Sequence, residues 1–434
     1  MALLRRILLA GAALWAGVAA GWPAQAQSLD DLAPYKMIRS LQFVQDTVVL
    51  GDHSAMEMQR FLLATIDERL RAAEASIFDD PRNVDAALIY AMSGGNPETL
   101  EMLIARDVAG HFDPRVTDAL RSYLSGTGVQ SAKPLAEIFP EYMQSRIGPY
   151  LALVSANSVL RRDPALALRY FDQARLSAPG TIVEEAALRR SIYIASQSGW
   201  VDRSMDYANR YARRFLRSPY ASQFADLFVK LSVDHFETID ESEIPAVLSF
   251  MDVPRQREVY LRMARLAAIS GKNRLASLAS KRAEALAGDG ESVPRVLAEL
   301  YGGLAAVPSA GVAEAMETLI AVPDDQLSAK DRALKAAATA IAEEVLRVPA
   351  APVPPPEIPP QDGRLATTAE LDDRAMDPRA PALVQDAKAG VEPKNPSEQA
   401  DGDQAAADPA FDTFVSDSRS RLDEIDALLR GEGS

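Results

Sequence analysis

Cysteine and histidine are scarce in this chain. Its 434 residues contain no cysteine and only three histidines, His53, His111 and His235. The lack of cysteine excludes disulfides, thiolate zinc sites and thiol nucleophiles, so the stability of the fold must come from buried area. The histidines lie far apart in the sequence and form no H-x-x-x-H or H-x-H arrangement, so we predict no metal site. We interpret His111 and His235, which have acidic neighbours, as surface or capping residues.

Motifs of nucleotide-binding and hydrolytic enzymes are missing as well. Gly126-Thr127-Gly128 lacks the third glycine of a dinucleotide loop, and the chain has neither a phosphate-binding loop nor a G-x-S-x-G elbow. Adjacent acidic residues leave open a glycosidase that acts on the cell wall. We favour helix ends and solvated faces for each of these pairs, which are Asp79-Asp80, Glu184-Glu185, Asp324-Asp325 and Glu343-Glu344. We therefore predict no catalytic residue and no cofactor.

Positive charge is in deficit. The chain has 46 Lys and Arg against 61 Asp and Glu, a formal net charge of -15. This sign disfavours non-specific binding to nucleic acid and to an anionic membrane surface. The hydrophobic fraction of 48% is ample for a packed core.

The amino-terminal segment has the pattern of a cleavable signal peptide. Arg5 and Arg6 precede an apolar run over residues 7–18, and Ala24-Gln25-Ala26 provides a small-x-small cleavage site. We predict that residues 1–26 are removed between Ala26 and Gln27, which would make the net charge two units more negative. No later run approaches the roughly 20 apolar residues that a spanning helix needs, so the mature chain is expected to be exported and soluble.

Residues 27–348 are predicted to form an all-α domain. Apolar residues recur at helical spacing, and strand-like alternation is hard to find. The first four helices are expected near residues 41–49, 56–70, 84–92 and 98–106. Gly51-Asp52 separates the first two, and the cluster from Ser93 to Pro97 ends the third, with Pro97 in the first turn of the fourth.

The central region contains an internal repetition. Its first copy is A-L-A-L-R-Y-F-D-Q-A-R-L-S-A-P over residues 165–179. A similar phrase follows roughly 40 residues later, where Tyr207, Tyr211, Phe215 and Leu216 precede Ser218-Pro219. A helix is expected to follow each copy, over residues 183–196 and 221–233. We predict a tetratricopeptide-like array of helical hairpins, an α-solenoid, whose concave face binds a partner. The same alternation over residues 261–286 and 296–319 is consistent with a continuation of the array. An irregular helical domain remains the alternative.

The composition changes after Val348. Residues 349–410 contain 12 of the 28 prolines and are predicted to be a disordered linker. Residues 411–430 are predicted to form a short amphipathic helix with one apolar face, made of Phe411, Phe414, Val415, Leu422, Ile425, Leu428 and Leu429. Such a helix is marginal alone, and a groove on a partner and the chain's own repeat array are equally credible docking sites.

A basic segment is the remaining candidate for binding. Arg210, Arg213, Arg214 and Arg217 are expected on one helical side, beside Tyr207 and Tyr211. They form either a binding face for an acidic partner or, as we favour, the solvated face of a repeat helix. The candidate partner-binding residues are thus Tyr207, Arg210, Tyr211, Arg214, Arg217, Phe414, Leu422, Ile425 and Leu429.

Two stretches resemble the MotC family, periplasmic flagellar motility proteins of α-proteobacteria. The first is P-Y-K-M-I-R-S-L-Q from Pro34, with V-L-G-D-H-S-A-M from Val49. The second is I-F-D-D-P-R-N-V-D-A-A-L-I-Y-A-M-S-G-G-N-P-E-T-L from Ile77 to Leu100. The family's order of export signal, helical body, proline-rich segment and terminal helix also matches the whole chain.

The resemblance implies a non-enzymatic protein needed for flagellar rotation. In the family picture it acts in the periplasm and binds the periplasmic arm of the stator protein MotB, and our hypothesis is that it holds this arm in an active conformation. An exported adaptor of another envelope complex would share the same composition, and a peptidoglycan hydrolase is the enzymatic alternative. The resemblance carries over no binding residue.

Overall fold

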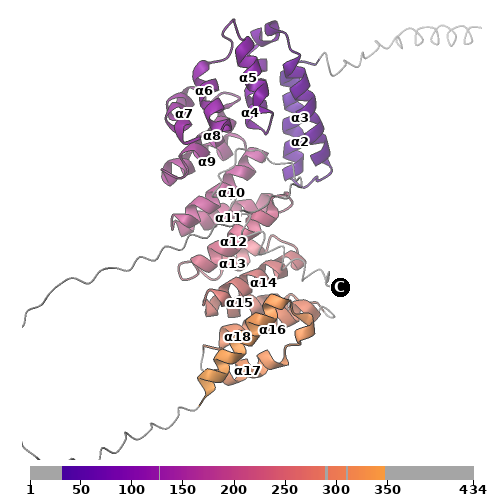
Figure 1. Cartoon of the computed structure of the whole chain (residues 1–434), viewed down its shortest axis with the longest axis vertical. Helices are drawn as coiled ribbons and strands as arrows, with labels where there is room; N and C mark the ends of the chain where they lie inside the picture. Colours follow the sequence, from indigo (N-terminus) through magenta and orange to yellow (C-terminus); the bar gives the residue numbers. More distant parts are fainter. Residues whose placement is uncertain (1–31, 127, 289–291, 309–310, 348–434) are drawn as a thin grey trace, which may run out of the picture. The chain divides into compact units, whose positions relative to one another are not determined.

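Every regular element that the structure describes is helical. The structure is a computed structural model that describes residues 32–126, 128–288, 292–308 and 311–347 (Figure 1). In these ranges it has seventeen α-helices, two short 3-10 helices and no strand, so the all-α prediction is confirmed. Within the same ranges, no helix is both long and apolar enough to cross a membrane. The predicted signal peptide, linker and terminal helix (1–26, 349–410 and 411–430) lie outside the described residues.

Four α-helices lie where the sequence analysis expected the first four, although the first begins seven residues earlier than residue 41. They are α2 (Pro34–Val49), α3 (Ala55–Arg71), α4 (Pro81–Met92) and α5 (Pro97–Arg106), with the 3-10 helix η2 (Ala75–Asp79) before α4. The side chains of Asp80 and Asn96 accept hydrogen bonds from the backbone of α4 and α5, and a proline follows each of them. Such a cap followed by proline fixes where a helix starts.

The middle of the chain is a series of helices that pack mainly on their neighbours in sequence, as Figure 1 shows. They are α6 (Pro114–Leu124), α7 (Gly128–Tyr142), α8 (Gly148–Val159), α9 (Pro164–Ser177), α10 (Ile182–Gln197), α11 (Val201–Arg214) and α12 (Ala221–Asp234). The helices expected over 183–196 and 221–233 are therefore present, as α10 and α12.

The remaining helices continue the same packing of neighbour on neighbour. They are α13 (Glu243–Leu248), α14 (Val253–Ile269), α15 (Asn273–Ala285), α16 (Ser292–Ala306), α17 (Val312–Ala321), the 3-10 helix η3 (Asp324–Gln326) and α18 (Ala329–Leu346). Residues 261–286, which the sequence suggested as a further repeat, span α14 and α15. A turn at Gly271, whose φ is +69°, joins these two helices.

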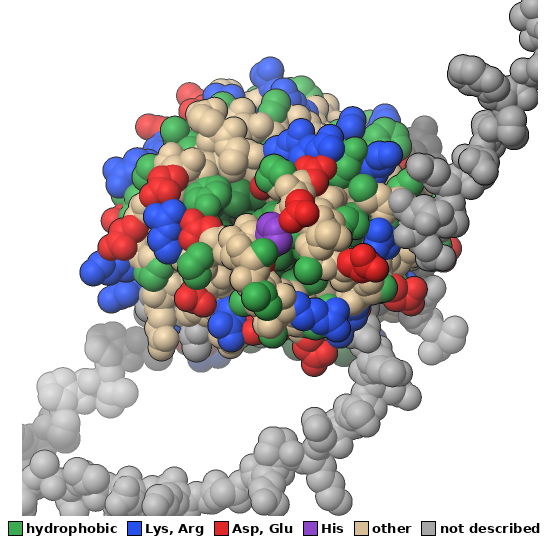
Figure 2. Space-filling view, turned by 90° about the horizontal axis from the view of Figure 1, so that it is seen from above, with side chains coloured by type: hydrophobic (Ala, Val, Ile, Leu, Met, Phe, Trp, Pro, Cys, Tyr) green, Lys and Arg blue, Asp and Glu red, His purple; other side chains and the backbone are tan. Residues whose placement is uncertain are grey.

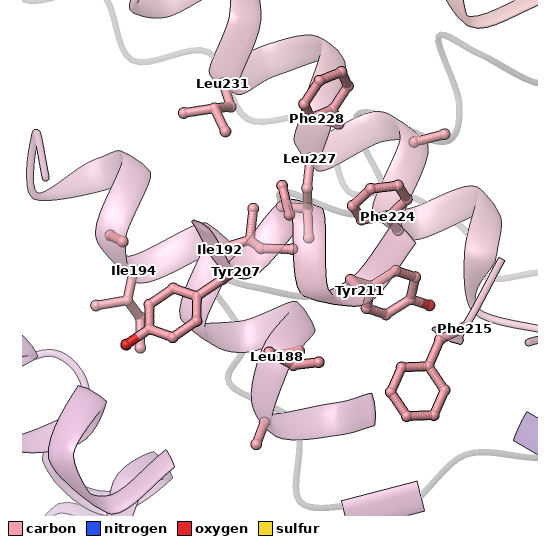
Figure 3. Close-up of a cluster of buried hydrophobic side chains, with 14 of the residues drawn as sticks. Leu188, Ile192, Ile194, Tyr207, Tyr211, Phe215, Phe224, Leu227, Phe228 and Leu231 are labelled. Atoms are coloured by element: carbon pink, nitrogen blue, oxygen red, sulfur yellow. The ribbon is translucent and has the colours of Figure 1, made fainter. Parts of the chain in front are cut away.

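The aromatic residues of the second copy of the repeated phrase lie in the core near α10 and α12 (Figure 3). The ring of Tyr211 stacks on that of Phe224 with 4.4 Å between centroids, and Phe215 lies 5.7 Å from Tyr211. All three are fully buried, as are Leu188 and Ile192 of α10. Burial of one such side chain stabilises the fold by about 1.5–3 kcal/mol.

Five tyrosines tie helices together through charged hydrogen bonds. Each hydroxyl donates to a carboxylate 23 to 35 residues away in sequence, and each carboxylate also pairs with an arginine. Hydrogen bonds to a charged group contribute about 1.5–3 kcal/mol. These Tyr–carboxylate–Arg clusters are Tyr90–Asp67–Arg71, Tyr142–Asp113–Arg115, Tyr207–Asp172–Arg175, Tyr211–Glu185–Arg189 and Tyr301–Asp331–Arg265.

The helix α2 also contacts helices far along the chain. Its Asp46 accepts a hydrogen bond of 3.0 Å from the backbone N–H of Ile182, the first residue of α10. Its Gln42 donates to the hydroxyl of Tyr150 in α8 at 2.9 Å. Asp46 thus caps α10 from the first hairpin, because Thr181 makes no side-chain cap of its own. Burial raises the pKa of Asp46, against the effect of this hydrogen bond.

Candidate partner-binding surface

Helix α11 divides its tyrosines from its arginines. At 3.6 residues per turn, its tyrosines and small residues fall on the side that faces α10 and α12, while Asp206, Arg210 and Arg213 fall on the exposed side. The helix therefore has a buried apolar face and a charged outer face. Any contact with a partner must come from the charged face.

The structure places Tyr207 and Tyr211 in the core. Tyr207 is 4% exposed, and its hydroxyl donates to Asp172 at 3.1 Å. Tyr211 is fully buried, and its hydroxyl donates to Glu185 at 2.8 Å. Burial first, and then the neighbouring carboxylate, raises the pKa of both phenols, so each stays a neutral hydrogen-bond donor. These two side chains stabilise the helix that carries the arginines and are not themselves on the surface.

The outer side of α11 borders a hollow of about 440 Å³, which we call the α11 hollow. Arg214 reaches across it to Glu184 of α10 at 2.6 Å. Arg213 donates to Asn209 at 2.7 Å, and its guanidinium lies 5.4 Å from the ring of Phe250. Arg210 is exposed and forms no hydrogen bond or ion pair with any residue that the structure describes. Arg210 is thus the cation of this hollow that is available to a ligand.

Arg217 does not share the helical face of the other arginines, so this part of the sequence prediction was wrong. Helix α11 ends at Arg214 because Phe215 turns into the core, and Arg217 follows in the turn before α12. There it packs on the loop between α2 and α3, since a Cβ added to Gly51 would lie 2.7 Å from the Cβ of Arg217. The two ends of the basic segment therefore face different parts of the surface.

Arg217 lines a second hollow, of about 320 Å³, which we call the α12 hollow. His53 from the loop before α3 and Arg255 from α14 lie on its wall. Arg255 donates to the carbonyl of Leu216 at 2.8 Å. Deeper in the wall, Arg262 is buried and pairs with Asp226 at 3.3 Å. Arg217 is exposed and has no hydrogen bond or ion pair within the described ranges.

A third hollow, of about 440 Å³, lies between α2, α4 and the start of α8. Arg39, Arg82 and Arg146 line it, together with Asp85. Arg82 is held by Asp80 at 2.6 Å and lies over the ring of Tyr35 at 4.1 Å. Basic, acidic and apolar side chains are interspersed on the face that Figure 2 shows. The positive charge of the three hollows is thus local, on a chain whose net charge is -15.

The acidic pairs serve the fold wherever a contact is seen. Asp80 caps α4, and Asp79 bonds to His111 at 2.9 Å. Glu184 pairs with Arg214 and Glu185 with Arg189, while Asp324 pairs with Lys335 at 2.7 Å. Glu343 and Glu344 lie exposed near the end of α18. Among the described residues, no group of three or more His, Cys, Asp or Glu is placed to hold a metal ion.

Sequence reasoning missed the residues that complete the hollows. Arg39, His53, Arg146 and Arg255 are far from the basic segment in sequence, and only the packing of α2 and α14 brings such residues together. No local pattern marks them. The predicted site residues Ala26, Gln27, Phe414, Leu422, Ile425 and Leu429 lie outside the described residues.

Comparison with known proteins gives one consistent result. The family model described as "Chemotaxis protein MotC" matches residues 1–434. The chain is 55% identical over 435 residues to the chemotaxis protein MotC of Rhizobium meliloti (strain 1021), with 98% of each chain covered. No solved structure matches this chain.

Proposed function

The chain belongs to the MotC family of chemotaxis proteins, and on that premise we propose that it is a non-enzymatic periplasmic partner of the stator protein MotB. The signal-peptide pattern of residues 1–26 supports export. The family resemblance in the sequence supports MotB as the partner. The protein would hold the periplasmic arm of MotB in the conformation that lets the stator work.

The body of this partner would be a tetratricopeptide-like array. In support, α14 packs on α15 and also on α16, and α10 packs on α8 and α12 as well as on its direct neighbours. Contacts with the next and the next-but-one helix are typical of stacked helical hairpins. The five Tyr–carboxylate–Arg clusters bridge 23 to 35 residues, so each joins parts of the chain no farther apart than about one repeat of 34 residues.

The arginine-lined hollows are the main evidence for where the partner binds. An acidic protein repels acidic segments at long range, so an acidic ligand must find local positive charge. Arg210 in the α11 hollow and Arg217 in the α12 hollow are both exposed and, within the described ranges, uncommitted. Arginine binds carboxylates through two parallel hydrogen bonds. We therefore assign the contact to acidic side chains of the MotB arm.

Binding would act through a shift of population. If the array binds the active conformation of the arm more tightly than the inactive one, it raises the active fraction by that ratio of affinities. A partner that bound both conformations equally would change nothing. The mechanism thus requires a difference in affinity, which a titration with locked arm variants measures.

The first test is isothermal titration of the full chain, as the cell produces it, into the periplasmic region of MotB from the same cell. We expect saturable binding that weakens as salt rises, because exposed charges are screened. The variant Arg210→Glu/Arg217→Glu should bind about tenfold more weakly, since two reversed surface pairs at about 0.5–1 kcal/mol each approach the 1.4 kcal/mol that a factor of ten requires.

The matched control is Lys133→Glu in α7. This lysine is 88% exposed and lies outside the three hollows. Its reversal changes the net charge by two units, as does each of the two arginine reversals. The affinity of this variant for the MotB region should stay within about twofold of that of the unchanged chain. If the double variant binds like the control, the assigned surface is wrong. If the MotB region does not bind at all, the partner is another protein of the envelope.

A further inference from the structure

The middle of α18, the last helix that the structure describes, has an apolar outer face, while Arg332, Glu343 and Glu344 are exposed nearer its ends. Between residues 333 and 342 of α18, the exposed positions are Ala333, Ala336, Ala337, Ala340 and Ile341. The charged residue in this stretch, Lys335, is turned away to the carbonyl of Val322 and to Asp324, each at 2.7 Å. Val345 is 58% exposed and Leu346 43% exposed. A terminal helix of a stacked array normally has a polar outer face.

Five positions of α18 form a heptad seam. Positions 331, 334, 338, 341 and 345 alternate spacings of three and four residues, and all but Asp331 are apolar, which is the pattern of a helix that packs against another helix. The body covers the first part of the seam, because Asp331 is 1% and Ala338 4% exposed. It leaves the second part open, because Ile341 is 57% exposed. The carboxyl-terminal part of the seam is therefore not covered by the other described helices.

The same chain contains a second seam with the same spacing. Residues 411, 415, 418, 422, 425 and 429 alternate spacings of four and three, and all but Ser418 are apolar. A helix over this range would be about 30 Å long, close to the roughly 27 Å of α18. The small alanines of α18 would allow the two helices to approach closely.

The intervening chain makes the docking intramolecular. The roughly 60 residues of 347–410 have a root-mean-square span of about 45 Å if they behave as a flexible coil. A tether of this length gives an effective concentration of order millimolar. At micromolar protein this exceeds the concentration of a second copy by about a thousandfold. We therefore infer that residues 411–430 dock on the open seam of α18 in their own chain and close the end of the array.

The test uses the lack of native cysteine. In the full chain, Ile341→Cys is combined with Ile425→Cys, and separately with Leu422→Cys, and disulfide formation is followed by mass and gel mobility at 1 µM. We expect at least one pair to form an intrachain disulfide at least tenfold faster than the control pair Val108→Cys with Ile425→Cys. Val108 is 98% exposed on the loop after α5, so that pair reports chance collision through the same tether.

A second pair of variants tests whether the disulfide rate depends on the apolar face of the terminal helix. Leu422→Glu/Leu429→Glu should slow the Ile341→Cys/Ile425→Cys reaction to the rate of the control, while Asp412→Lys/Asp423→Lys should leave it unchanged. Equal rates at residues 341 and 108 would overturn the inference, and so would a product found only between two chains. The chain is tested alone, so failure here leaves the proposed MotB contact unaffected.

Discussion

The buried pair Glu185–Arg189 should be a sensitive point of the helical fold. Glu185 is fully buried and Arg189 is 9% exposed, with 3.0 Å between Nε and the carboxylate. Arg189 also donates to Gln223 at 2.6 Å, and its guanidinium lies 4.7 Å from the ring of Tyr220. Although burial lowers the pKa of Arg189, the neighbouring carboxylate outweighs it and the pKa is raised. The guanidinium therefore stays charged inside the protein.

The perturbation is Glu185→Gln, which keeps the shape of the side chain and an acceptor for Tyr211. It leaves the charge of Arg189 buried without its counter-ion, and breaking a buried pair in this way costs about 3–5 kcal/mol. Adding Arg189→Met to the same chain removes the stranded charge, so the double variant should recover most of that loss. The two effects should thus be strongly non-additive.

The assay is urea unfolding followed by circular dichroism at 222 nm. The control is Glu137→Gln, which removes the acid of an i,i+4 pair whose side chains are 67% and 88% exposed. Such an exposed pair contributes about 0.3–0.5 kcal/mol. If Glu185→Gln costs no more than this control, or if the double variant is less stable than the single one, the role assigned to the buried pair is refuted.

Two further predictions follow from other contacts. Hydrogen bonds to Asp79 and then to Asp107 raise the pKa of His111. Its contribution to stability is therefore complete below the unfolded pKa of about 6.5 and is lost as pH rises through the folded pKa. The difference in urea midpoint between the unchanged chain and His111→Gln should shrink from pH 5 to pH 9, and a constant difference would contradict this. Gly51→Ala should cost about 1–3 kcal/mol, because φ is +116° and the new Cβ would meet Arg217. Gly110→Ala, with φ +75° and no atom within 4 Å, should cost less in the same assay, and an equal loss would show that the contact with Arg217 has no effect.

Local signals in the sequence predict the helices well. The proline after Asp80 and Asn96, and the apolar spacing in α2 to α5, fix elements that tertiary packing does not need to correct.

The surface is predicted less well, because it depends on which helices meet. Tyr207 and Tyr211 were expected beside the arginines as contact residues, but their carboxylate partners come from α9 and α10 and hold them inside. Arg217 was expected on α11, but burial of Phe215 ends that helix three residues earlier. The wall of the α12 hollow combines residues as far apart in the sequence as His53 and Arg262. Local periodicity in the sequence does not show that such distant residues lie together.

The cap that Asp46 provides for α10 also sets an order of events in folding. A chain is made from its amino terminus, so Gln42 and Asp46 emerge long before their respective partners Tyr150 and Ile182, which follow 108 and 136 residues later. Until then the side of α2 that faces α8 and α10 has nothing to pack on. The first hairpin therefore waits in an unfinished state while the middle of the chain is made, and contacts of such long range slow folding.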